Sequence, residues 1–145
     1  MDDSLYQQLL NTIKLFKKQS VNFTEYGTQN FHNLYDKHDT ENKFKLLINR
    51  KGHLRTDVLT YQMISEKHGI MVRLDMTGTP HDDKNGNSVE TPHLHIFDEE
   101  HNMGRWAIPL SEITDQEIIY ELLDSLTVFL SYNTVETKNL KIPIF

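Results

Sequence analysis

The chain contains no cysteine and few residues that interrupt regular structure. Its 145 residues include four prolines and six glycines. The absence of cysteine excludes thiolate nucleophiles, iron–sulfur clusters and cysteine-ligated zinc, and it fits a reducing cytosol. Any metal would therefore need histidine or carboxylate ligands, and the chain has eight histidines to offer.

Long apolar runs and an excess of positive charge are also missing. No run approaches the roughly 20 apolar residues that span a bilayer, and the first residues, Met1-Asp2-Asp3-Ser4, are acidic where a secretory signal is basic. We therefore expect a cytoplasmic protein with no membrane partner. The net charge of −6 argues against a general nucleic-acid-coating surface, but it leaves room for a nuclease with one local basic groove.

Two segments have the apolar spacing of helices. Apolar residues at every third or fourth position after Ser4 predict a helix from about Leu5 to Lys18. A broader stripe over residues 118–130 predicts a C-terminal helix, which Ser111 or Thr114 would cap. The apolar tip at residues 142–145 is expected to dock on the core or on a partner.

Between these helices, five segments show the alternation of β-strands. They are residues 44–49, 58–65, 70–76, 92–97 and 105–108. Residues 21–42 have no sustained period and are predicted to be a loop with at most a short strand or helical turn, with His32 and His38 on the surface. The chain is thus expected to form a single α+β domain over residues 1–145. This domain would be an antiparallel meander of about five strands with both helices on one face.

The fourth predicted strand carries His93 and His95 on one face, because side chains alternate along a strand. The third and fourth strands are expected to form a hairpin. If Leu74 is placed opposite Leu94, Asp75 lies beside His93 and Arg73 lies beside His95. The strand pair therefore predicts a polar cluster on the face away from the helices.

Other residues are expected to join this cluster. His81 can reach it from the loop between the two strands, as can Asp82, Asp83 and Glu90, and Arg105 can reach it from the fifth strand. In one interpretation His81, His93 and His95 bind a divalent metal.

A second interpretation is acid–base chemistry, since histidine titrates near neutral pH. Asp75 would then orient a histidine, and Arg73 or Arg105 would stabilise a phosphate. The competing interpretation is that the strand histidines are ordinary polar residues on a solvated sheet face.

Two enzyme motifs share part of this pattern. Gly86, His93, His95, Glu99 and Gly104 resemble the first cupin motif, whose two histidines and glutamate hold a metal, but the second cupin motif is missing. The stretch from residue 93 to residue 97 is similar to part of the histidine-triad nucleotide-hydrolase signature, except that phenylalanine replaces the third histidine.

A fuller resemblance covers about 40 residues in the middle of the chain. The motifs are Arg73-Leu74-Asp75, Gly78-Thr79-Pro80-His81, Pro92-His93-Leu94-His95 and Trp106-Ala107-Ile108-Pro109-Leu110, with an Asp/Asn/Gly-rich loop at residues 82–87. In this order they resemble a family of small uncharacterised bacterial proteins, a domain of unknown function. A looser likeness extends to the TumE-type predicted toxins of toxin–antitoxin pairs.

These patterns lead to three functional hypotheses. The first is a hydrolase or ribonuclease of the toxin kind, with RNA as substrate or an antitoxin-like protein partner. The second is a non-enzymatic interaction protein, such as a phage or mobile-element regulator. The third is a module that binds a metal or a small ligand.

Overall fold

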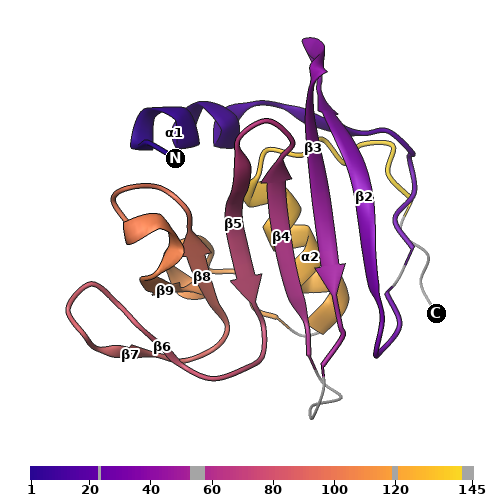
Figure 1. Cartoon of the computed structure of the whole chain (residues 1–145). Helices are drawn as coiled ribbons and strands as arrows, with labels where there is room; N and C mark the ends of the chain where they lie inside the picture. Colours follow the sequence, from indigo (N-terminus) through magenta and orange to yellow (C-terminus); the bar gives the residue numbers. More distant parts are fainter. Residues whose placement is uncertain (23, 53–57, 119–120, 142–145) are drawn as a thin grey trace.

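The computed structural model describes residues 1–22, 24–52, 58–118 and 121–141. They form an α+β fold around a seven-stranded antiparallel sheet in the order β1-β2-β3-β4-β5-β8-β9, beside a separate two-stranded sheet, β6-β7 (Figure 1). The strands are β1 (Lys14–Phe16), β2 (Gln29–Asp36), β3 (Asp39–Asn49), β4 (Thr60–Ser65), β5 (Gly69–Asp75), β6 (His81–Asp82), β7 (Ser88–Val89), β8 (His93–Ile96) and β9 (Ala107–Pro109). The helices are α1 (Asp3–Asn11), α2 (Glu121–Tyr132) and two short 3-10 turns, η1 (Asn102–Gly104) and η2 (Leu110–Glu112).

The α+β class and the antiparallel meander are confirmed, but the sheet has more than the five predicted strands. The loop predicted at residues 21–42 is wrong, because it contains β2 and the start of β3. The polar residues of β2 hide its alternation, since one of its faces is open to solvent. Pairing with β3 along the whole strand overrides this weak local signal. His38 is exposed as predicted, whereas His32 is half-buried and packs its ring edge-on against Phe16.

Helix α1 is shorter than the predicted segment because a buried lysine lies at its end. Its first turn is capped by Asp2, whose carboxylate accepts a hydrogen bond from the Leu5 amide. After Asn11 the chain becomes extended, and the Lys14 ammonium donates to the carbonyl oxygens of Leu9 (2.7 Å) and Asn133 (2.7 Å). Unpaired carbonyls at a helix end need such a donor. Of the apolar positions beyond residue 12 that looked helical, Phe16 therefore belongs to β1, and Ile13 lies in the extended segment just before it.

Helix α2 lies against one face of the sheet, behind β4 in Figure 1. The Tyr61 hydroxyl is hydrogen-bonded to Ser125 Oγ at 2.8 Å, and its ring stacks on Phe129 at 5.5 Å between centroids. Residues 113–118 are not helical, so neither Ser111 nor Thr114 caps this helix. The predicted apolar tip at residues 142–145 lies outside the described residues. No helix in the described part of the chain is long and apolar enough to cross a membrane.

The buried apolar residues of both helices and of the central strands form one hydrophobic cluster. The two helices also meet directly, because the hydroxyls of Tyr6 and Tyr132 lie 2.8 Å apart. Along the strands, the residues that face α2 alternate with residues on the opposite face. That opposite face carries the predicted cluster.

Candidate metal centre

The predicted pairing of the histidine strand is confirmed. Strands β5 and β8 are antiparallel, with Asp75 opposite His93 and Arg73 opposite His95. These four side chains alternate with apolar residues that face α2, so they project from the other side of the sheet. The hydrophobic alternation of both strands predicted which side chains share a face, because a slip of one residue would have placed the histidines in the apolar core. The pairing of Leu74 with Leu94 was assumed, and the structure confirms it.

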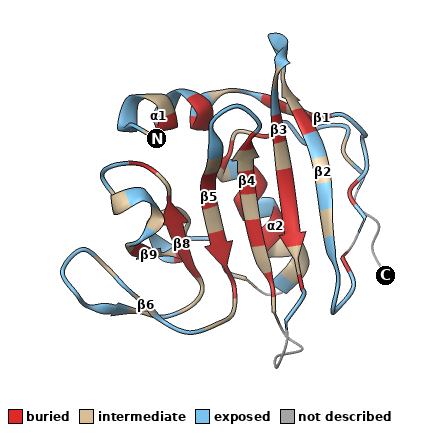
Figure 2. Ribbon diagram, viewed as in Figure 1, coloured by how far each residue is buried: buried red, intermediate tan, exposed pale blue. Residues whose placement is uncertain are grey.

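The two strand histidines are not on a solvated surface. His93 is fully buried and His95 is 3% exposed, and Asp75 is 9% exposed. Strand β8 is buried along its whole length (Figure 2). The interpretation of His93 and His95 as ordinary solvated residues is therefore wrong, since buried polar groups of this kind need specific partners.

His81 reaches the cluster from β6, as the sequence suggested. Its Nδ1 atom lies 3.1 Å from His93 Nε2 and 3.2 Å from His95 Nε2. The same two Nε2 atoms lie 3.2 Å and 3.3 Å from Asp75 Oδ2. Three ring nitrogens and one carboxylate oxygen, from two different sheets, therefore converge on one point.

Backbone carbonyls fix which nitrogen of each strand histidine faces this point. His93 Nδ1 is bonded to the Val89 carbonyl oxygen at 3.1 Å, and His95 Nδ1 to the Gly104 carbonyl oxygen at 2.8 Å. A carbonyl can only accept, so each Nδ1 must carry the hydrogen, and in the neutral ring Nε2 then has a free lone pair. The lone pairs of both rings thus point toward a carboxylate, an arrangement that favours a bound cation.

Asp75 is held in place through both of its oxygens. Oδ1 accepts a hydrogen bond from the Thr60 hydroxyl at 3.3 Å and lies 3.2 Å from Arg73 Nε, while Arg73 Nη2 donates to Oδ2 at 3.3 Å. Burial raises the pKa of the Asp75 carboxyl, but the hydrogen bonds that His93 and His95 donate through Nε2 when their rings are protonated, together with the charge of Arg73, outweigh it. The net pKa therefore lies well below its usual value. The group is a carboxylate at neutral pH.

His81 is the more accessible member of the cluster, being half-buried. Burial, together with the neighbouring His95 and His93, lowers its pKa, which Asp75 only partly opposes. The His81 ring is therefore neutral near pH 7 and can offer a lone pair, as a metal ligand must.

The structure does not bring every predicted residue to the cluster. Arg105 is exposed in the turn before β9, and within the described residues no hydrogen bond or ion pair links its side chain to the histidines. Asp83 instead shapes the β6–β7 turn, where its carboxylate accepts from the Asn85 and Asn87 amides. Asp82 and Glu90 are exposed. Glu99, the cupin-like glutamate, is also exposed and outside the cluster.

Sequence reasoning missed the groups that orient the ligands. Thr60 and the Val89 carbonyl gave no signal, because nothing in the local sequence shows that a threonine hydroxyl or a backbone oxygen will hydrogen-bond to a ligand and orient it. For Gly104, whose carbonyl oxygen orients His95, the sequence offered one signal, the glycine itself, because glycine adopts a positive φ without strain. Its φ of +86° and the Phe97 ring, which a Cβ atom would meet at 2.6 Å, require glycine there.

A second set of possible ligands, Asp98, Glu100 and His101, lies in the turn after β8. Asp98 Oδ1 already accepts from the His101 amide at 2.8 Å and from His101 Nδ1 at 2.7 Å. This oxygen therefore caps its own turn through two N–H donors, whereas the ligand atoms of the first cluster come from two different sheets.

Comparison with known proteins places the chain in a family without assigning an activity. The model of a family of unknown function, DUF6978, matches residues 1–135. The chain belongs to this family. The sequence-based resemblance to a domain of unknown function is therefore confirmed, while the likeness to TumE-type toxins stays a prediction. No curated protein and no solved structure matches the chain.

Proposed function

We propose that this member of the DUF6978 family is a metal-binding domain that holds one divalent transition-metal ion, best fitted by Zn²⁺, between Asp75, His81, His93 and His95. The observation that carries the proposal is the convergence of their four ligand atoms, which all lie within 4.8 Å of one another. Metal–ligand bonds of about 2.0–2.1 Å in a tetrahedral zinc site imply ligand–ligand separations of about 3.3 Å. Four of the six separations between these atoms are 3.1–3.3 Å, and the other two are no longer than 4.8 Å.

The types of ligand also support a transition metal. Imidazole nitrogen suits Zn²⁺, Ni²⁺, Cu²⁺ and Fe²⁺, whereas Mg²⁺ and Ca²⁺ prefer shells made only of oxygen. Metal-binding histidines usually donate their other ring hydrogen to a carbonyl or carboxylate. His93 and His95 both do so, which leaves their Nε2 lone pairs for the ion.

The experiment is a zinc titration of chelator-treated protein by isothermal titration calorimetry. We expect one Zn²⁺ per chain, and loss of that binding in His93→Ala and in His95→Ala. His38→Ala is the matched control, because His38 is exposed and distant in sequence from the cluster. Absence of stoichiometric binding to the wild type would contradict the proposal, as would equal loss in the His38 control.

Hydrolysis, including cleavage of RNA, is the second candidate, and one observation favours it. His81 comes from a short hairpin rather than from the main sheet, and it is the most exposed of the four ligands. Its departure would give a bound metal the open position that catalytic sites keep. The partly exposed Arg73 guanidinium, beside Asp75, would then stabilise a phosphate.

RNA cleavage by the wild type, with and without chelator, tests this second candidate. We expect metal-dependent cleavage that His95→Ala abolishes. Activity that survives both the chelator and the His93→Ala and His95→Ala substitutions would remove these residues from the mechanism. Binding of an antitoxin-like protein stays a prediction of the TumE likeness.

A further inference from the structure

The face of the central strands β2, β3 and β4 opposite α2 carries no helix in the described part of the chain (Figure 1). In Figure 1 this face of β2, β3 and β4 is turned toward the reader, with α2 behind it. Strand pairing aligns one continuous row of side chains across it. The row runs from β2 to β8 through Phe31, Leu47, Gln62, Arg73 and His95, each the register partner of the next.

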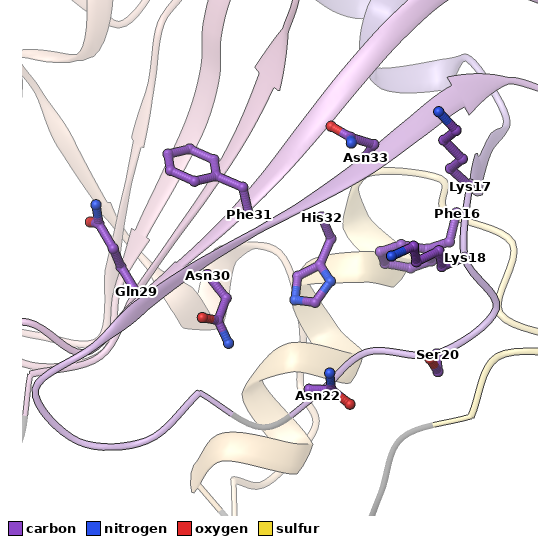
Figure 3. Close-up of a pocket in the computed structure, with 10 residues that line it drawn as sticks. All are labelled: Phe16, Lys17, Lys18, Ser20, Asn22, Gln29, Asn30, Phe31, His32 and Asn33. Carbon is purple, nitrogen blue, oxygen red and sulfur yellow. The ribbon is translucent and has the colours of Figure 1, made fainter.

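This row connects an exposed aromatic side chain with the candidate metal centre. Phe31 at its outer end is 55% exposed. Figure 3 shows Phe31 and Asn33 on the side of β2 opposite His32, which points back toward α2. Five neighbouring strands at about 4.8 Å spacing cover about 19 Å. A chain lying along the row would therefore pass from Phe31 to the ligand His95.

The charge on this face is opposite to that of the whole protein. Lys45 pairs with Asn33 and Lys43 with Tyr35 next to the row, and Arg73 lies within it. Asp75 is the only acidic residue among the paired positions of this face from β2 residues 29–35 to β8, and it forms an ion pair with Arg73. A local basic face on a chain of net charge −6 indicates an anionic partner.

We propose that this face binds single-stranded nucleic acid, with a base stacked on Phe31 and the phosphate backbone crossing Lys45 and Arg73 toward the metal centre. Unpaired bases stack on exposed aromatic rings, and lysine and arginine hold the backbone. The amides of Asn33 and Gln62 offer donors and acceptors to base edges between these positions. The surface ends at the proposed metal site, but the residues that would hold the nucleic acid, Phe31, Lys45 and Arg73, are not metal ligands, so binding is expected without metal.

An extended acidic peptide is the principal rival occupant, because it would satisfy the same cations. It would leave the Phe31 ring without a partner, since acidic side chains do not stack on it. A duplex would also satisfy the cations, but its bases are already stacked. Dependence of the affinity on an aromatic ring at position 31 therefore separates these partners.

The test is fluorescence anisotropy in the presence of EDTA. The chelator removes any metal, so the result for nucleic-acid binding is independent of the proposed metal site. The probes are labelled 12-residue oligouridylate, 12-residue oligothymidylate, a duplex of the same length and a polyglutamate peptide. We expect the single strands to bind more tightly than the duplex and the peptide. A preference between the first two will distinguish RNA from DNA.

Substitutions then locate the contact. Phe31→Ala should weaken single-strand binding about tenfold, while Phe31→Tyr, which keeps a ring, should restore it. Lys45→Glu should weaken binding and reduce its salt dependence, whereas Lys138→Glu, an exposed control outside the sheet, should do neither. The proposal is overturned if single strands bind no better than polyglutamate, or if Phe31→Ala and Lys45→Glu bind like the wild type.

Discussion

His81 Nδ1 and His93 Nε2 lie 3.1 Å apart although the two residues belong to different sheets. This contact links the β6–β7 hairpin to the main sheet, as do those of His81 with His95 and of Val89 with His93. A metal shared by the two rings would therefore fasten the hairpin. We predict that zinc slows amide hydrogen exchange in residues 81–89 of the wild type. In His81→Ala, zinc should leave the exchange unchanged; equal protection in this variant would show that the hairpin is not held through His81.

The second prediction concerns Thr60, which donates a hydrogen bond to Asp75 Oδ1. Thr60→Val preserves the shape of the side chain and removes the donor. Removal of such outer partners lowers metal affinity by about 10- to 100-fold. We expect a loss in this range in competition with a chromophoric chelator. Thr40→Val, at an exposed position in β3, is the control and should bind metal like the wild type; similar affinities for all three proteins would exclude a role for Thr60.

The third prediction follows from the lowered pKa of Asp75. Its pKa in the unfolded chain is near 3.8 and lies lower in the folded protein. The carboxylate therefore stabilises the fold. This stabilisation is fully present when the pH is above the pKa of Asp75 in the unfolded chain, and it is lost as the pH falls through the pKa of Asp75 in the folded protein. In metal-free protein, the difference in free energy of unfolding between the wild type and Asp75→Asn should shrink below about pH 4. Chemical denaturation across this range measures it, and a difference that stays constant in acid would contradict the assigned shift.

The fourth prediction concerns Gly104, whose carbonyl oxygen orients His95. In Gly104→Ala the new Cβ would meet the Phe97 ring at 2.6 Å. Overpacking of this kind costs about 1–3 kcal/mol, and displacement of the loop should also weaken zinc binding. Gly86→Ala is the matched control, because its φ is also positive but its Cβ would meet nothing within 4 Å. Thermal unfolding and zinc affinity of the two variants test this, and equal effects would show that the Phe97 contact is unimportant.

The sequence predicted the site better than the outer part of the fold. The shared face of Asp75, His93 and His95 followed from apolar alternation, since Leu74 and Leu94 must both face the core, and the assumed pairing of these two leucines is confirmed. Strand β2 was missed because its outward positions, such as Gln29 and Asn33, are polar and its partner strand supplies the stability. The predicted N-terminal helix ran too far because the apolar spacing of α1 continues into β1. No local signal showed that Lys14 would be buried at the end of the helix.

The candidate site was also only partly predictable. The spacing of His93 and His95 and the position of Asp75 predicted three neighbours, and His81 was assigned from its place in the loop. The distances between them depend on how the β6–β7 hairpin folds back, which is a tertiary property. For Arg105 the predicted strand began two residues too early, so the side chain that was expected on the sheet lies in an exposed turn.

The most direct test of the metal centre is anomalous X-ray scattering at the zinc edge from crystals of zinc-loaded protein. The account predicts one strong peak about 2.0–2.2 Å from each of the four ligand atoms of Asp75, His81, His93 and His95. A fully occupied peak at Asp98 and His101 instead, or no peak between the three histidines, would contradict it.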